Sequence, residues 1–216
     1  MELVLKDVTK KFGDNVILKN VNLKFESGKI YGFIGRNGSG KSVLLKLICG
    51  FYAVTSGEIL LDGMNYTEKN SFPEDTRALI EKPNFIPDLT GFENLKLLAS
   101  IQDKINDDQI KKAMEEVNIP ISSDKKYSKY SLGTKQKLGI AQVLMEDPKI
   151  IILDEPFNGI ENETVKKLRK VLLKEKKKGK IIILATHIKE DIDELADVVY
   201  EVDDGIITEI KKKKNV

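Results

Sequence analysis

Residues 35–42 combine the residue types and the spacing that a phosphate-binding loop needs. They read GRNGSGKS and match G-x-x-x-x-G-K-[ST] without exception. Glycines let the backbone curl so that successive N–H groups point at phosphate oxygens, and the following helix offers unpaired amides and the positive end of its dipole. Lys41 is suited to reach the β- and γ-phosphates, and Ser42 to ligate Mg²⁺. The expected phosphate contacts are Asn37, Gly38, Ser39, Gly40, Lys41 and Ser42.

Two adjacent carboxylates follow a second apolar segment. Residues 150–156 read IIILDEP, and the β-branched run is typical of a strand buried on both faces of a parallel sheet. Ligands of such sheets bind at the carboxyl ends of the strands. Asp154 is therefore suited to hold Mg²⁺, directly or through water, and Glu155 to polarise a water for in-line attack on the γ-phosphate. By itself the pair is better explained as a solvated acidic turn, but beside a phosphate loop it favours chemistry.

The elements that must position these groups are visible in the apolar pattern. Residues 30–34 form a β-prone run directly before the loop, and residues 43–48 form an apolar helical run after it. Residues 85–147 look like a helical insert, in which Ile110, Ala113, Met114 and Val117 share one helical face. In the last third, buried strands at 150–153 and 181–184 flank a helix, and residues 198–210 suggest a closing hairpin. Strands alternating with helices predict a wound α/β core.

Composition excludes several classes of protein. The 216 residues carry 36 Lys and Arg against 34 Asp and Glu. The resulting net charge of +2 is too small to create an overall positive electrostatic field that would attract nucleic acid. Cys49 is the single cysteine, which excludes a disulfide within the chain and indicates a reducing cytosol. The first residues lack a signal-peptide pattern, and no apolar run approaches the ~18 residues that span a bilayer. We therefore expect any membrane role to act through a partner.

Two further features each allow two interpretations. The lysine-rich runs at residues 174–180 and 211–214 are either solvated or meet anionic lipid headgroups. The apolar residues Phe85, Phe92 and Leu95 either belong to the core or cup a helix of a membrane partner.

A third motif points to a family. Residues 130–138 read YSLGTKQKL and resemble the LSGGQ-type signature of ABC-transporter ATPases, with Ser131 and Gly133 kept and Leu132 and Thr134 substituted. The order of phosphate loop (Walker A), signature and acidic strand is characteristic of that family, and the resemblance covers essentially the whole chain.

The resemblance implies a fold and a domain organisation. The fold would be α/β, with a P-loop NTPase (RecA-like) core, an N-terminal antiparallel β subdomain and a helical insert. Residues 1–216 would form one ABC ATPase domain. Its core would comprise residues 1–84 and 148–216, and its helical subdomain residues 85–147.

The resemblance also implies roles for residues that carry no strong signal of their own. Phe12 would stack on adenine, with Val16 packed below it. The only histidine, His187, follows the buried strand at 181–184, where the family has a histidine that contacts the γ-phosphate and helps position the attacking water. A lone histidine is more often a surface or core residue, but this position favours the functional interpretation.

The signature implies a partner of the same kind. In this family Ser131 and Gly133 would contact the γ-phosphate held by a second subunit, so that ATP joins a head-to-tail homodimer. An N-cap role for Ser131 is compatible with this. Residues 158–161 stand at the D-loop position.

Three departures from the family pattern concern the site. Glu81 stands where the family usually has a hinge glutamine; it can still bind Mg²⁺ or water, but it adds negative charge beside the phosphates. Val43 replaces a common hydroxyl that touches the α-phosphate, which leaves only its backbone N–H. Glu161 replaces the D-loop aspartate. The segment at residues 78–95, with this glutamate, resembles the subgroup that exports bacitracin or confers lantibiotic immunity.

We therefore expect an ATP-hydrolysing subunit of an ABC exporter, using ATP and Mg²⁺. It would be cytoplasmic and peripheral at the inner face of the membrane, beneath separate transmembrane permease subunits, with no nucleic acid as partner. One alternative is a nucleic-acid-associated or translation-associated ABC ATPase. Such proteins usually carry two cassettes or a long coiled-coil insert, whereas Lys41 and Ser131 are only 90 positions apart. A non-hydrolysing nucleotide-binding regulator is a third possibility, which Asp154, Glu155 and His187 disfavour.

Overall fold

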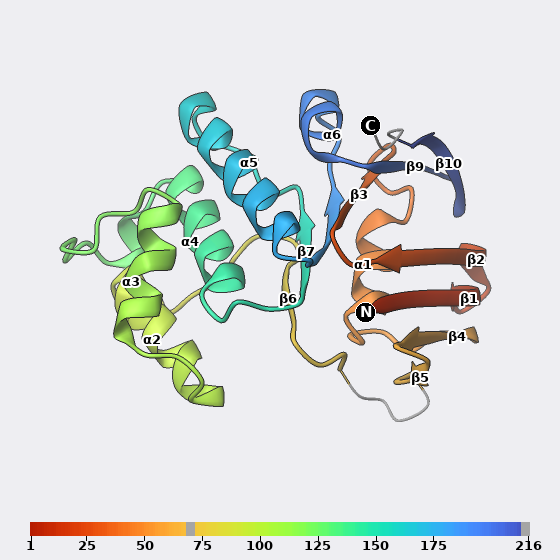
Figure 1. The fold of residues 1–216 in the computed structure, drawn as a ribbon, viewed down its shortest axis with the longest axis horizontal. Coiled ribbons are helices and arrows are strands. Elements are labelled where there is room, and N and C mark those ends of the chain that lie inside the picture. Colours follow the sequence, from red (N-terminus) through yellow and green to blue (C-terminus); the bar gives the residue numbers. More distant parts are fainter. Residues whose placement is uncertain (68–71, 213–216) are drawn as a thin grey trace.

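The computed structural model describes residues 1–67 and 72–212, with side chains up to residue 210. These residues form two β-sheets with helices around them (Figure 1). The strands are β1 (Glu2–Phe12), β2 (Asn15–Glu26), β3 (Lys29–Ile34), β4 (Ser56–Leu61), β5 (Met64–Asn65), β6 (Thr76–Leu79), β7 (Ile150–Asp154), β8 (Ile181–Ala185), β9 (Val198–Asp203) and β10 (Ile206–Lys212). The helices are α1 (Lys41–Ile48), α2 (Gly91–Gln102), α3 (Asp107–Glu116), α4 (Leu132–Leu144), α5 (Asn162–Lys177) and α6 (Lys189–Leu195).

The sheet order brings the predicted chemical groups to one edge. The larger sheet runs β10-β9-β3-β8-β7-β6, and all its pairings are parallel except that of β9 with β10. The smaller sheet runs β2-β1-β4-β5 and is antiparallel. Since β3, β8 and β7 are neighbours and parallel, their carboxyl ends meet. The predicted α/β fold with an N-terminal antiparallel subdomain is confirmed.

The continuous apolar strands are explained by burial on both faces. Ile150 and Ile152 of β7 pack in a cluster with α1 and the antiparallel sheet, whereas Ile151 and Leu153 pack in the cluster that includes the helical side of the molecule. All four side chains are buried, and burying each one stabilises the fold by about 1.5–3 kcal/mol compared with leaving it exposed to water. The strand therefore holds Asp154 rigidly at its end.

Helices α2, α3 and α4 gather at the end of the molecule away from the antiparallel sheet (Figure 1). Capping boxes begin two of them, with Thr90 and Glu93 at α2 and Asn106 and Gln109 at α3. Leu95 is fully buried in this region, which assigns it to the core, and Phe85 and Phe92 pack against the same cluster half-buried. The division into a core and a helical subdomain at residues 85 and 147 stays a prediction.

The sequence patterns predicted neither strand β6 nor helix α6. Strand β6 reads Thr-Arg-Ala-Leu, is short and depends on pairing with β7 over its whole length. Helix α6 contains only seven residues, and the buried guanidinium of Arg169 on α5 holds Asp191 at its start, with Nε 3.0 Å from Oδ1. Both elements are stabilised by distant partners, which no local window reveals.

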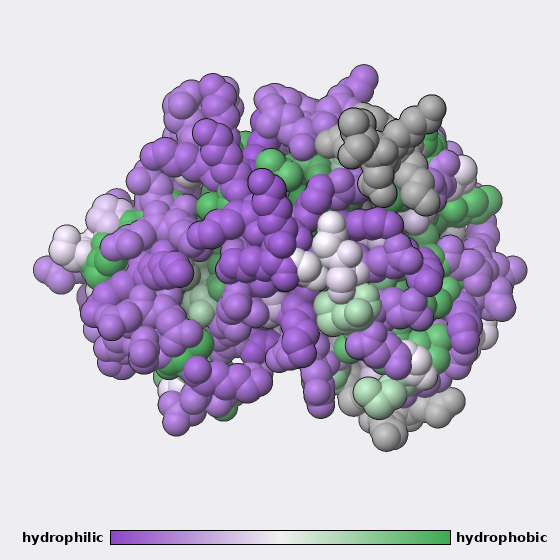
Figure 2. Space-filling model, viewed as in Figure 1, coloured by the Kyte–Doolittle hydropathy of each residue, from purple (hydrophilic) through white to green (hydrophobic). Residues whose placement is uncertain are grey.

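The surface is rich in paired charges. Figure 2 shows hydrophilic side chains over most of the face that it displays. In the first lysine run, Lys176 pairs with Asp197, and Lys180 is buried against Glu175, so these lysines form ion pairs within the chain. The side chains of the second run, residues 211–214, lie outside the described residues. Within the described ranges, no helix combines the length and the apolar character needed to cross a membrane.

Candidate functional site

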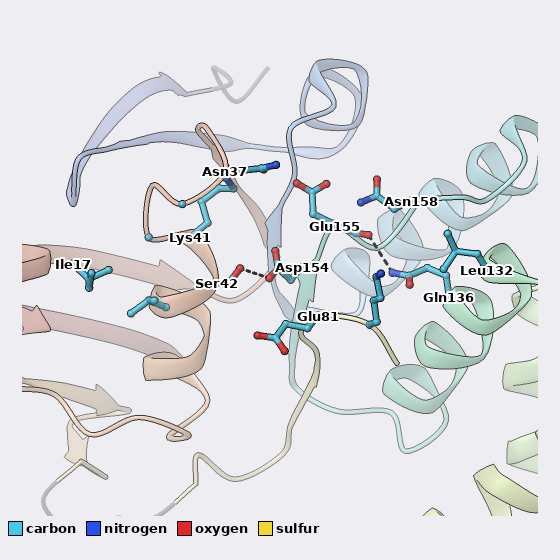
Figure 3. Close-up of a pocket in the computed structure, with 14 residues that line it drawn as sticks. Ile17, Asn37, Lys41, Ser42, Glu81, Leu132, Gln136, Asp154, Glu155 and Asn158 are labelled. Atoms are coloured by element: carbon cyan, nitrogen blue, oxygen red, sulfur yellow. Dashed lines mark hydrogen bonds between the residues drawn. The ribbon is translucent and has the colours of Figure 1, made fainter. Parts of the chain in front are cut away.

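The phosphate loop and the acidic strand end line one cavity of about 630 Å³ (Figure 3). The loop and the start of α1 form one side, and the ends of β6 and β7 with the start of α4 form the other. The lining residues are Ile17, Asn37, Gly38, Gly40, Lys41, Ser42, Val43, Glu81, Lys82, Leu132, Gln136, Asp154, Glu155 and Asn158. The structure thus brings together most of the residues predicted to bind phosphate and metal.

The loop is shaped by the backbone before α1. Gly40 has φ +110°, a conformation that L side chains rarely adopt, and it is the N-cap of α1. Lys41 is only 6% exposed, and its Nζ donates to the carbonyl oxygens of Gly35 at 2.7 Å and Arg36 at 2.9 Å. The buried Ser39 Oγ has no hydrogen-bond partner among the described residues. A helix N-terminus, a buried ammonium and an unsatisfied hydroxyl fit a phosphate group.

The oxygen donors that Mg²⁺ prefers lie beside this loop. Ser42 Oγ donates to Asp154 Oδ2 at 2.6 Å, and Asp154 is 6% exposed. Burial raises the pKa of Asp154 above its ordinary value; the Ser42 hydrogen bond opposes this shift, and the charge of Glu155 adds to it. Within residues 1–67 and 72–212, no three His, Cys, Asp or Glu side chains form a metal-binding group. Mg²⁺ in nucleotide sites typically uses one or two protein oxygens plus phosphates, so Ser42 and Asp154 fit it.

Glu155 is held by the end of the neighbouring strand β8. Its Oε1 accepts from the backbone N–H of His187 at 3.1 Å and lies 2.8 Å from the His187 ring Nδ1, while Oε2 accepts from Thr186 Oγ1 at 3.2 Å. A carboxylate only accepts, so the Nδ1 of His187 carries the hydrogen. Glu155 itself has φ +46°. His187 does not itself line this cavity; it lines a second one, together with Gly35 and Arg36 of the loop. It reaches the first cavity only through its contact with Glu155, 32 positions away in the sequence.

The turn that carries Glu155 is also hydrogen-bonded to helix α4, which begins inside the signature segment at residues 130–138. Gln136 on α4 donates from Nε2 to the carbonyl oxygen of Glu155 at 3.1 Å, and its side chain is buried (Figure 3). Gln136 was not predicted as a site residue. Its place on α4 five positions after Ser131, inside the signature segment, is the only signal in the sequence that could have found it.

Glu81, predicted as a metal ligand, lines the cavity but does not join the Ser42–Asp154 pair. Its Oε1 accepts from Lys46 Nζ on α1 at 2.5 Å. Glu81 also has φ +64°, at the first residues after β6. The carboxylate points toward α1 in Figure 3. The sequence offered no sign of Lys46, which lies 35 positions away.

The predicted adenine contacts lie at the edge of this arrangement. Phe12 and Val16 do not line the cavity, whereas Ile17 does. The exposed Phe12 ring meets Tyr52 edge to face, with 5.3 Å between ring centroids. Since successive side chains of a strand point to opposite faces, the one-residue step from Val16 to Ile17 decides which enters the cavity.

The predicted signature contacts lie outside the cavity, although their neighbours line it. Ser131 is the exposed N-cap of α4 and accepts from the Thr134 N–H at 3.2 Å. Gly133 packs so tightly that an added Cβ would lie 2.2 Å from the Gly159 carbonyl oxygen. Leu132 and Asn158 do line the cavity. The signature turn and the D-loop segment therefore form one packed surface beside the phosphate loop.

Comparison with known proteins agrees with this geometry. The model of the family described as ABC transporter matches residues 18–158. An uncharacterized ABC transporter ATP-binding protein of Bacillus subtilis, YybJ, is 39% identical over 92% of this chain and 91% of its own length. The bacitracin transport ATP-binding protein BcrA of Enterococcus faecalis is 36% identical over 97% of this chain and 69% of its own length.

Solved structures share the fold over the whole chain. A dimeric, post-hydrolysis structure of the ATP-binding cassette MJ0796, bound to ADP and Pi, has a TM-score of 0.87 and 25% identity. The match covers 99% of this chain and 100% of that one.

Proposed function

The chain belongs to the ABC transporter family and is an ATPase that uses ATP with Mg²⁺, and from this premise we propose that it powers a peptide exporter. Its cargo would be a peptide antibiotic or a similar amphiphile, moved by separate transmembrane permease subunits. The observation that carries the ATPase role is the single cavity in which the phosphate loop, Asp154 and Glu155 meet. The bacitracin transport relative supports the peptide cargo.

Binding of the triphosphate would rest on groups that are already in place. The amides at the start of α1 and the Lys41 ammonium would take the phosphates, and Ser42 and Asp154 would hold Mg²⁺. When bound, Mg²⁺ supplies charge neutralisation for the β- and γ-phosphate oxygens. The exposed Phe12 ring would stack on the base, and Ile17 would line its path.

Hydrolysis would depend on Glu155 and His187. Phosphoryl transfer to water needs positioning and charge stabilisation more than covalent chemistry. The Glu155 carboxylate, now bonded to His187 and Thr186, would accept a hydrogen bond from the attacking water and orient it. His187, held at the same point, would contact the γ-phosphate. The hydrogen bond from Gln136 would keep the Glu155 turn in position.

A second copy of the chain would complete the site. Ser131 and Gly133 lie outside the cavity, on a surface beside it, so they would serve the nucleotide of a partner arranged head to tail. The dimeric cassette MJ0796 supports this arrangement. In the cell, the pair would sit at the inner face of the membrane through its permease partners.

The decisive variant for the ATPase role is Glu155→Gln, which keeps the shape of the side chain but cannot take a proton. We expect ATP turnover to fall at least about 100-fold while ATP binding stays within a few-fold. Phosphate release and fluorescent-nucleotide binding measure the two quantities, and size-exclusion chromatography with ATP should show an accumulating dimer. Glu163→Gln, at an exposed residue of α5, is the matched control. Normal turnover in Glu155→Gln would refute the assigned role.

The exporter role needs a separate experiment. The tagged chain, recovered from detergent-solubilised membranes, should carry hydrophobic subunits with it, and mass spectrometry would identify them. Recovery of the chain with nucleic acid or ribosomes in place of membrane subunits would contradict the proposal.

A further inference from the structure

The hinge carboxylate Glu81 is engaged by a lysine that no motif contains. Lys46 lies on α1, four positions after Ser42, and residues four apart share one face of a helix. The two side chains reach neighbouring strands of the same sheet edge. Ser42 contacts Asp154 at the end of β7, and Lys46 contacts Glu81 just after β6, which pairs with β7. One face of α1 thus carries two polar links to the far side of the cavity.

The charges around the cavity show why this second link matters. The cavity must accept a polyanionic nucleotide, yet three carboxylates and only two lysines line it: Glu81, Asp154, Glu155, Lys41 and Lys82. Lys41 is bonded to carbonyl oxygens of the loop and pairs with none of the three carboxylates. Of these three, Asp154 is bonded to a neutral hydroxyl. Glu81 has a lysine partner that lies outside the lining. That partner supplies a positive charge without occupying the space needed for the phosphates.

Lys46 is itself held in place. Its side chain is 21% exposed, and its Nζ lies 5.4 Å from the centroid of the Tyr52 ring, within the range of a cation–π contact. The Glu81 side chain is 66% exposed, and its carboxylate points toward α1 in Figure 3. Lys46 is therefore the more buried partner, and its ammonium anchors the Glu81 carboxylate.

Resting on the proposed ATPase function, we propose that Lys46 is a positioning residue that neutralises Glu81 and keeps its carboxylate against α1. The pair allows a cavity with a glutamate at its hinge to accept Mg²⁺ and a triphosphate. Removing Lys46 would leave an unpaired negative charge beside the phosphates, which opposes nucleotide binding through space. Because the interaction acts through Glu81, it disappears when Glu81 carries no charge.

A double-mutant cycle tests this dependence. The full chain is titrated with a fluorescent ATP analogue, with Mg²⁺ and with EDTA, for the wild type, Lys46→Met, Glu81→Gln and the double variant. Lys46→Met should weaken binding about three- to tenfold at low ionic strength, and less than about twofold in about 0.5 M salt. In the Glu81→Gln background the same substitution should change binding by less than about twofold. Lys46→Arg should restore wild-type binding.

Lys96→Met provides the matched control. Like Lys46, Lys96 pairs with a carboxylate, that of Asp107, and its Nζ lies 5.9 Å from the centroid of an aromatic ring, that of Phe92. Lys96 does not line the cavity. This variant should leave binding unchanged. Thermal unfolding separates folding from binding, and Lys46→Gln replaces Lys46→Met if the latter unfolds. An equal loss with and without Glu81, an unchanged affinity or a tighter one would each overturn the inference. A wild type that binds no nucleotide would instead refute the proposed function.

Discussion

The phosphate loop and the signature segment both lie at the N-terminus of a helix, yet they differ in burial and in hydrogen bonding. At the start of α1, Lys41 is 6% exposed, and its ammonium has two carbonyl partners. At the start of α4, Ser131 is exposed, its hydroxyl interacts with Thr134 alone among the described residues, and Leu132 is 56% exposed. The two ends offer similar amides and dipoles. Their difference shows that the tertiary surroundings, rather than the helix end itself, decide at which end the predicted phosphate contacts line a cavity within one chain.

What surrounds each segment explains the contrast. The first faces the carboxyl ends of β7 and β8, so Asp154 and Glu155 close over it. The signature segment packs on one side only, where Gly133 meets Gly159, and its residues Ser131 and Leu132 stay exposed. We therefore interpret the first as a complete half-site and the second as a half-site for a partner. Three variants test this interpretation, in order of decreasing effect.

The largest effect is expected from Gly133→Val. The added side chain would begin 2.2 Å from the Gly159 carbonyl oxygen, so the signature and the D-loop segment must separate. We expect ATP turnover to fall about 100-fold or more, with a loss of about 1–3 kcal/mol in the free energy of unfolding. Nucleotide binding by the monomer should stay within about threefold. Urea unfolding, phosphate release and nucleotide titration give the three values.

If Gly133→Val reduced nucleotide binding by the monomer as strongly as turnover, the signature segment would belong to the same half-site as the phosphate loop. That result would contradict the interpretation. Gly63→Val is the control. Gly63 has φ +80°, and no described residue lies within 4 Å of the point that an added Cβ would occupy. Valine there strains the backbone without a steric clash, so this variant should lower the free energy of unfolding and leave turnover intact.

An intermediate effect is expected from Ser42→Ala, which removes the hydroxyl that contacts Asp154. Asp154 would then lose a hydrogen bond in a buried place, and Mg²⁺ would lose a ligand. We expect the affinity for the Mg²⁺–nucleotide complex to fall about 10- to 100-fold, and the affinity measured in EDTA to change little. Titration with and without Mg²⁺ tests this. An equal loss under both conditions would remove Ser42 from the metal site.

The smallest effect is expected from Ser131→Ala. Loss of the N-cap costs about 1 kcal/mol of unfolding free energy, which urea unfolding measures. Binding by the monomer should be unchanged, while turnover falls about tenfold because one contact to the partner's phosphate is lost. Thr90→Ala, at the N-cap of α2, matches the stability loss and should leave turnover intact. If both variants turned over ATP equally, Ser131 would be only a cap.

Much of the fold followed from local patterns, and its exceptions are informative. The runs at residues 150–153 and 181–184 predicted strands buried on both faces because every residue in them is apolar. Strand β6 contains Arg77, which is bonded to Glu146, so its pattern resembles a loop until β7 pairs with it. Strands and helices that depend on a distant partner carry a weak local signal.

By itself, the sequence determined the phosphate loop, the acidic strand end and the buried strands that carry them. These depend on neighbouring residues, whose backbone freedom and apolar spacing act within a few positions. Only the tertiary structure decided that Ile17 rather than Val16 lines the cavity, that Gln136 holds the Glu155 turn, and that Lys46 faces Glu81. The last two contacts join residues 19 and 35 positions apart, and all three depend on strand register and helix orientation, which packing of the whole core sets.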